Sequence, residues 1–177
     1  MANPYLIRHP PVCLQNICYG QTDLELQPNW NMWLNEIIPN MQPLDRVYSS
    51  SLKRTSLVAS ALAEYWGCPL ILDDHLLELN FGKWDGRPWV DIPENEINDW
   101  GVDLWLNAPP QGESAFLLTQ RVQEWWESVA PDCARERIAV VGHGGPMRVL
   151  LGGFQRHRIL QNVRHNIDYG AWLEWLC

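Results

Sequence analysis

The sequence has no apolar run that approaches the ~20 residues of a membrane span, so it predicts no transmembrane helix. The N-terminal residues, MANP, lack the basic region and the cleavage site of a signal peptide, and we expect a cytoplasmic protein. Basic residues are also scarce: 13 Lys and Arg stand against 21 Asp and Glu, for a formal net charge of −8. Because phosphate backbones attract basic surfaces, we expect no nucleic-acid partner.

Cysteine usage gives no sign of a disulfide framework or a zinc site. The five cysteines are an odd number, and no C-x-x-C pair occurs among them, which fits reduced thiols. Clusters with metal-ligand spacing are lacking as well, so we expect neither a metal nor a cofactor. No G-x-S-x-G motif occurs, and a serine esterase is set aside.

The 177 residues, 46% of them hydrophobic, suit one domain with a substantial core, and we predict a single domain over 1–177. The 11 tryptophans are unusual. Core packing is the favoured explanation for them, and the alternative is that some of those between Trp84 and Trp105 line a substrate mouth. The acidic, proline-broken stretch 73–112 is too long for a plain connection, and we predict that it is a cap that selects the substrate.

The pattern of apolar residues predicts alternating strands and helices. Strands are expected over 5–9, 46–49, 69–72 and 138–143, with an edge strand over 171–175. Helices are expected over 29–38, from Ser50 or Ser51 as cap to residue 66, over about 94–106, from 114 onward and over about 146–152. A strand–helix–strand order implies parallel strands. We therefore predict an α/β fold: a three-layer sandwich with a mostly parallel central sheet, helices on both faces and an edge strand near the C-terminus.

Two of the buried strands end in a histidine, His9 and His143. Open α/β sheets bind their ligands at the carboxyl edge, so these two residues suggest one site there. Arg8 and Arg54 fall near the same edge and can clamp an anion through paired N–H groups. A neutral imidazole in such a cluster can attack phosphorus, and a nearby glutamate could protonate the leaving oxygen.

Five blocks carry a resemblance to a known family. They are 6–9 (LIRH), 48–55 (YSSSLKRT), 77–86 (LELNFGKWDG), 112–114 (GES) and 140–145 (VVGHGG). In this order they resemble the histidine phosphatase superfamily, which comprises phosphoglycerate mutases and related phosphatases. The resemblance implies that Arg54 binds phosphate and that Glu78 is the acid. The segments 17–23 (ICYGQTD) and 144–148 (GGPMR) look most like the α-ribazole-5′-phosphate phosphatases.

The chain departs from the family pattern directly after His9. Pro10 and Pro11 follow where family members usually have glycine, and Pro10 lacks the N–H that glycine would provide. A polar residue that often contacts phosphate a few positions later has no certain match, and Gln15 or Asn16 could serve.

The resemblance implies a metal-independent phosphomonoesterase that acts through a phosphohistidine on a small phosphorylated metabolite, with α-ribazole 5′-phosphate as a candidate. The catalytic residues would be His9, Glu78 and His143. The phosphate would bind Arg8, Arg54 and Gly144, and weaker contacts would come from Gln21 and Thr22. Two alternatives stay open: a phosphoglycerate mutase-type phosphotransferase, and a non-catalytic protein that binds phosphorylated ligands. The sequence does not predict an oligomeric state.

Overall fold

The computed structural model describes residues 3–133, 135–163 and 167–175. Within these residues a five-stranded sheet has the order β3-β2-β4-β1-β5. The strands are β1 (Tyr5–Arg8), β2 (Arg46–Ser49), β3 (Leu70–Leu72), β4 (Ile138–Gly142) and β5 (Trp172–Glu174). All neighbours pair in parallel except β5, which runs antiparallel to β1 at one edge. The predicted mostly parallel sheet with an edge strand near the C-terminus is confirmed.

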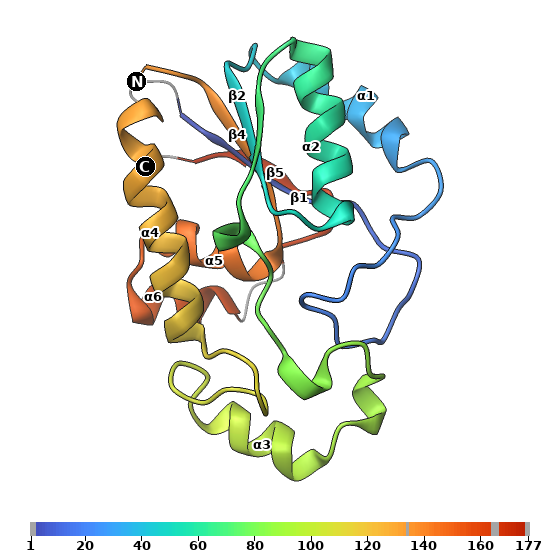
Figure 1. Ribbon diagram of the computed structural model, residues 1–177, viewed down its shortest axis with the longest axis vertical. Helices are drawn as coiled ribbons and strands as arrows, with labels where there is room; N and C mark the ends of the chain where they lie inside the picture. Colours follow the sequence, from blue (N-terminus) through green and yellow to red (C-terminus); the bar gives the residue numbers. More distant parts are fainter. Residues whose placement is uncertain (1–2, 134, 164–166, 176–177) are drawn as a thin grey trace.

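Helices cover both faces of the sheet, as Figure 1 shows for α2 (Lys53–Trp66) and α4 (Ala115–Cys133). Alternate residues of the strands enter two separate apolar cores because side chains in a strand point to opposite faces. Ile7 and Val141 pack in one core with residues of α2, whereas Leu6 and Val140 pack in the other with residues of α4. The predicted three-layer α/β sandwich is therefore confirmed.

The remaining helices are short. They are η1 (Trp30–Trp33), α1 (Leu34–Ile37), η2 (Ile38–Asn40), α3 (Glu94–Val102), α5 (Gly144–Leu151) and α6 (Arg156–Val163). Helix α5 begins at Gly144, two residues before the expected Pro146, and α6 has no counterpart in the sequence prediction. The proposed serine cap of α2 is wrong: the N-cap position is Leu52, and the Asp23 carboxylate accepts the Lys53 N–H at 3.0 and 3.2 Å.

The stretch 73–112 (green to yellow in Figure 1) extends beyond the sheet and contains α3 with three 3₁₀ turns. These turns are η3 (Asp74–Leu76), η4 (Gly82–Trp84) and η5 (Trp89–Asp91). Trp84 is fully buried in a small core of this stretch, where its indole N–H donates to Glu96 at 2.7 Å. Trp89 instead lines the main pocket, so core packing explains Trp84, and the substrate-mouth explanation stays a prediction for Trp89.

Main-chain hydrogen bonds join this stretch to the loop that follows β1. Trp89 N–H donates to the Asn16 carbonyl at 3.0 Å, and Cys18 N–H donates to the Arg87 carbonyl at 2.8 Å. In return, Gly86 N–H donates to the Cys18 carbonyl at 2.7 Å. These two irregular segments therefore form one continuous wall beside the carboxyl edge of the sheet.

Candidate active site

The carboxyl ends of the two central strands bring the predicted histidines together. Strands β1 and β4 pair with Arg8 opposite Gly142, so His9 and His143 follow at the same edge of the sheet. The pairing continues one residue further, because His9 N–H donates to the Gly142 carbonyl at 3.1 Å. The two imidazole rings meet edge to face with their centroids 5.3 Å apart. Both side chains are buried.

The structure fixes which nitrogen of His9 is reactive. Nδ1 lies 2.7 Å from the carbonyl oxygen of Pro10, and a carbonyl can only accept, so Nδ1 carries the proton and Nε2 keeps its lone pair. Burial, reinforced by the positive charges of Arg54 and Arg8, lowers the pKa of His9 from 6.5 to about 3. The imidazole is therefore neutral at neutral pH, as a nucleophile must be. Pro10 supplies the carbonyl that sets this tautomer.

Arg8 and Arg54 place two positive charges beside His9. Arg54 is fully buried in the first turn of α2 and donates to main-chain carbonyls of the loop 20–22. Arg8 donates to the carbonyl of Ile167. These partners are neutral, and among the described residues neither guanidinium belongs to an ion pair. Since a buried cation without an ion-pair partner is costly, Arg54 favours an anionic ligand at this site.

Three buried nitrogen atoms around His9 lack a hydrogen-bond partner in the described part of the chain, and two of them indicate an anionic ligand. Nε of Arg8, Nε of Arg54 and Nδ1 of His143 have no hydrogen-bond partner among the described residues. Buried polar atoms are nearly always paired, and leaving one unpaired costs roughly 1–3 kcal/mol. Phosphoryl oxygens are strong acceptors, so a phosphate group would satisfy the two guanidinium N–H groups.

Glu78 reaches the site from the stretch 73–112. Its Oε1 accepts the N–H of Leu79 and the N–H of Gly145, both at 2.9 Å, and Oε2 lies 3.3 Å from the same Gly145 nitrogen. An added Cβ on Gly145 would lie only 2.2 Å from Oε1, so only glycine lets the carboxylate approach this closely. The main chain at Leu79 and the first turn of α5 thus hold the carboxyl group in place.

A salt bridge between Arg121 and Glu113 stabilises the main chain at Glu78. Arg121 of α4 binds both carboxylate oxygens of Glu113, at 2.6 and 3.1 Å. The same guanidinium donates to the main-chain carbonyls of His75 at 2.6 Å and of Glu78 at 3.1 Å. This arginine was not singled out from the sequence, and it fixes the backbone that presents the predicted acid.

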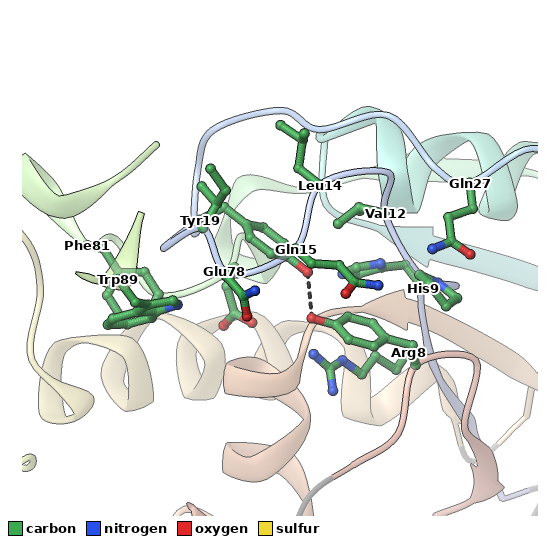
Figure 2. Close-up of a pocket in the computed structure, with 14 residues that line it drawn as sticks. Arg8, His9, Val12, Leu14, Gln15, Tyr19, Gln27, Glu78, Phe81 and Trp89 are labelled. Atoms are coloured by element: carbon green, nitrogen blue, oxygen red, sulfur yellow. Dashed lines mark hydrogen bonds between the residues drawn. The ribbon is translucent and has the colours of Figure 1, made fainter. Parts of the chain in front are cut away.

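Two tyrosines also belong to the site, although neither was among the predicted site residues. The hydroxyl groups of Tyr19 and Tyr169 are hydrogen-bonded at 2.6 Å. The dashed line in Figure 2 marks this bond. Arg8 stacks on the ring of Tyr169, with Cζ 3.8 Å from the centroid, and Arg54 Cζ lies 5.1 Å from the ring centroid of Tyr19. Each arginine therefore rests on one ring of a connected pair, which restricts where the two charges can lie.

The loop 20–22 carries the predicted weaker contacts Gln21 and Thr22. Neither residue is among those that line the main pocket. Their N–H groups donate instead to the Asp85 carboxylate, at 2.8 Å from Gln21 and 3.0 Å from Thr22. On the other side of the loop, the Thr22 carbonyl accepts from Arg54 at 2.8 Å. This loop therefore links a carboxylate of the stretch 73–112 to the buried arginine, and its contacts are made by the main chain.

The main pocket has a volume of about 550 Å³ and includes three of the predicted residues, Arg8, His9 and Glu78. Arg54 and His143 are fully buried beside them. Gly144 begins α5, where an added Cβ would lie 2.8 Å from Nη1 of Arg148. The outer walls are formed by Pro11, Val12, Leu14, Gln15, Asn16, Ile17, Tyr19, Gln27, Phe81, Trp89 and Tyr169, several of which Figure 2 labels.

Two features are absent from the described part of the chain. There, no helix is both long and apolar enough to cross a membrane. Across the same residues, no three or more His, Cys, Asp and Glu side chains are grouped so that they could hold a metal ion. Metal independence stays a prediction, which turnover in the presence of a chelator tests.

Known proteins resemble this chain in sequence and in fold. A phosphoserine phosphatase of Hydrogenobacter thermophilus is 32% identical over 112 residues, which are 60% of this chain and 52% of that protein, so the chain spans about half its length. A probable phosphoglycerate mutase of Erwinia tasmaniensis is 30% identical over 160 residues, 85% of this chain and 74% of that protein. The α-ribazole phosphatase of Shigella flexneri shares the fold, with a TM-score of 0.82 and 22% identity over 96% of this chain and 88% of that one.

The sequence model described as "Histidine phosphatase superfamily (branch 1)" matches residues 5–174. This span runs from the first residue of β1 to the last residue of β5 and includes both histidines at the carboxyl edge. The chain therefore belongs to the histidine phosphatase superfamily.

Proposed function

We propose that this protein is a phosphomonoesterase that acts through a phosphohistidine on His9. One observation carries the proposal: a neutral histidine, with its tautomer set by the Pro10 carbonyl, lies beside two arginines whose Nε–H groups have no partner among the described residues. This arrangement combines a nucleophile with a binding site for the group that it attacks.

In the first step, Nε2 of His9 forms a bond to phosphorus and the ester P–O bond breaks. The departing oxygen takes a proton from Glu78, while Arg8 and Arg54 stabilise the charge on the phosphoryl oxygens. In the second step, water attacks phosphorus and gives a proton to Glu78. The N–P bond then breaks, inorganic phosphate leaves, and both His9 and Glu78 return to their starting forms.

The pocket walls suggest the chemistry of the leaving group. Phe81 and Trp89 meet edge to face, with centroids 5.8 Å apart, and present aromatic surface together with apolar side chains. The carboxamides of Gln15, Asn16 and Gln27 add hydrogen-bonding groups without charge. Walls of this kind favour an uncharged leaving group that combines a flat ring with hydroxyl groups. α-Ribazole 5′-phosphate, whose leaving group is an uncharged sugar bearing a benzimidazole ring, is our candidate substrate, with 73–112 as the cap that selects it.

The first test is release of phosphate from p-nitrophenyl phosphate in the presence of a chelator. We expect turnover by the unaltered protein, loss of turnover in His9→Ala, and a phosphorylated protein that is trapped by acid quench only where His9 is present. His157→Ala is the matched control, because that histidine is exposed on α6. Absence of both turnover and the phosphoprotein would overturn the proposal in favour of a binding protein.

A second test compares substrates. We expect kcat/KM to be higher for α-ribazole 5′-phosphate than for phosphoserine or 3-phosphoglycerate, whose leaving groups carry charge. The likeness to a phosphoglycerate mutase favours one alternative, which the same experiment checks. Conversion of 3-phosphoglycerate to 2-phosphoglycerate faster than release of inorganic phosphate would identify a mutase instead.

A further inference from the structure

Two hydroxyl groups connect His143 to the start of helix α2. Ser50 Oγ lies 2.7 Å from Nε2 of His143, and Thr55 Oγ1 lies 2.7 Å from Ser50 Oγ. Thr55 Oγ1 also lies 2.8 Å from the carbonyl oxygen of Leu52. The side chains of Ser50, Thr55 and His143 are all fully buried, so water does not compete for these bonds. The mechanism above leaves this chain of hydroxyl groups unused.

The protons in this chain can be arranged in two ways. In the first, Nε2–H of His143 donates to Ser50, Ser50 donates to Thr55, and Thr55 donates to the Leu52 carbonyl. In the second, Thr55 donates to Ser50, Ser50 donates to Nε2, and the proton of the neutral imidazole is on Nδ1. Both arrangements hold the same number of protons, and both give every hydroxyl proton an acceptor. The Leu52 carbonyl also keeps its N–H donors from Thr55 and Ser56, at 3.0 and 2.9 Å, in either case.

The two arrangements differ at Nδ1 of His143, which is buried and has no partner among the described residues. In the first arrangement Nδ1 is an acceptor, and a phosphoryl oxygen, which is also an acceptor, would be repelled. In the second arrangement Nδ1 carries a proton and can donate to that oxygen. A doubly protonated imidazole could donate as well, but burial and the charges of Arg54 and Arg8 oppose it and keep the pKa of His143 well below 6.5.

We propose that Ser50 and Thr55 are positioning residues for phosphoryl transfer: in the phosphate complex Thr55 donates to Ser50 and Ser50 donates to His143, so that the neutral imidazole presents Nδ1–H to the phosphoryl group. This inference rests on the proposed function, which places the phosphoryl group beside His143. It gives Ser50 and Thr55 a role that is distinct from helix capping and from direct phosphate binding.

The kinetic test compares Ser50→Ala, Thr55→Val and Thr55→Ser with the unaltered protein. Ser50→Ala should lower kcat about 10- to 100-fold, because it removes a buried hydrogen bond that strengthens as charge develops, and should change KM little, because the arginines still hold the ester. Thr55→Val should lower kcat by a smaller factor, and Thr55→Ser should restore it. Ser49→Ala is the matched control: Ser49 is equally buried, but its hydroxyl donates only to the Ser50 carbonyl, at 2.9 Å.

The spectroscopic test measures the ¹⁵N chemical shifts of the His143 ring with inorganic phosphate bound. We expect the proton on Nδ1 in the unaltered protein and a different protonation pattern in Ser50→Ala. If Ser50→Ala and the unaltered protein have equal kcat values, or the same His143 tautomer, the inference is overturned while the proposed function stays intact. If the unaltered protein neither turns over esters nor binds phosphate, the proposed function fails and this inference fails with it. Should Ser50→Ala not fold, Thr55→Val against Thr55→Ser makes the same comparison.

Discussion

Replacement of Gly145 by alanine is expected to displace the carboxyl group proposed as the acid, without touching His9. An added Cβ would lie 2.2 Å from Oε1 of Glu78 and 3.1 Å from Cδ2 of Leu118. The carboxyl group must therefore retreat by about 1 Å, and a misplacement of that size can lower a rate about 100-fold. The retreat would also break the hydrogen bond from Gly145 N–H, which is 2.9 Å long.

The size of the effect should depend on the leaving group. An alkyl oxygen needs a proton as it departs, and general acid catalysis is worth about 100-fold or more to such a reaction. p-Nitrophenolate is stable as an anion and needs no proton. We therefore expect Gly145→Ala to lower kcat for glycerol 2-phosphate about 100-fold, and kcat for p-nitrophenyl phosphate by less than about tenfold. Steady-state kinetics on the two esters measures this ratio directly.

Gly101→Ala is the matched control for this substitution. Gly101 lies in α3, and no atom lies within 4 Å of an added Cβ. It should leave the ratio of the two kcat values unchanged and stabilise the protein by about 0.5–1 kcal/mol, because alanine restricts the unfolded chain. An equal fall for both esters in Gly145→Ala, or no fall for either, would refute the assignment of Glu78 as the acid.

Three further predictions follow from the supporting contacts. Because the pKa of His9 is lowered, between pH 6.5 and about 3 the unfolded chain binds a proton at His9 that the folded chain does not. As the pH falls through this window, His9 should therefore lower the free energy of unfolding by about 1.4 kcal/mol per pH unit, in addition to the effect of His143. Urea unfolding of His9→Asn should show a pH dependence that is shallower by this amount. Asp85→Asn, which weakens the bonds to the loop that holds Arg54, should raise the Kd of inorganic phosphate roughly tenfold in a calorimetric titration, whereas the exposed Asp91→Asn should not. Tyr169→Leu removes the ring under Arg8 and should weaken phosphate binding by about 1 kcal/mol; unchanged affinity would show that stacking does not position this guanidinium.

The fold could be predicted well where the signal was local. The apolar runs that end in His9 and His143 are continuous because β1 and β4 are central strands buried on both faces. Helix α6 was missed because Ile159 is its one buried residue among those described, so its apolar period is weak. The start of α5 was placed two residues late because proline at a first helical position is a strong signal, whereas glycine there is not.

The site was less predictable because its supports connect residues far apart in the chain. Nothing in the residues near Lys53 shows that the Asp23 carboxylate accepts its N–H at the start of α2. Nor do they show that Ser50 forms a hydrogen bond with His143. The same holds for Tyr169, which stacks on Arg8 although the two residues lie near opposite ends of the sequence. Family blocks identify groups that perform the chemistry, but a long-range hydrogen bond leaves no pattern in the residues around it.

The wall of the pocket has a consequence for how the ligand specificity of this protein could change. Main-chain bonds, such as those between Trp89 and Asn16 and between Cys18 and Arg87, hold its two segments together. Such bonds persist when the side chains change, provided that the new residues are not proline. Leu14 and Gln15 in particular are exposed and can be exchanged without loss of buried packing. Selection in the laboratory could therefore change the wall residues one position at a time, while the sheet edge, to which we assign the chemistry, stays the same.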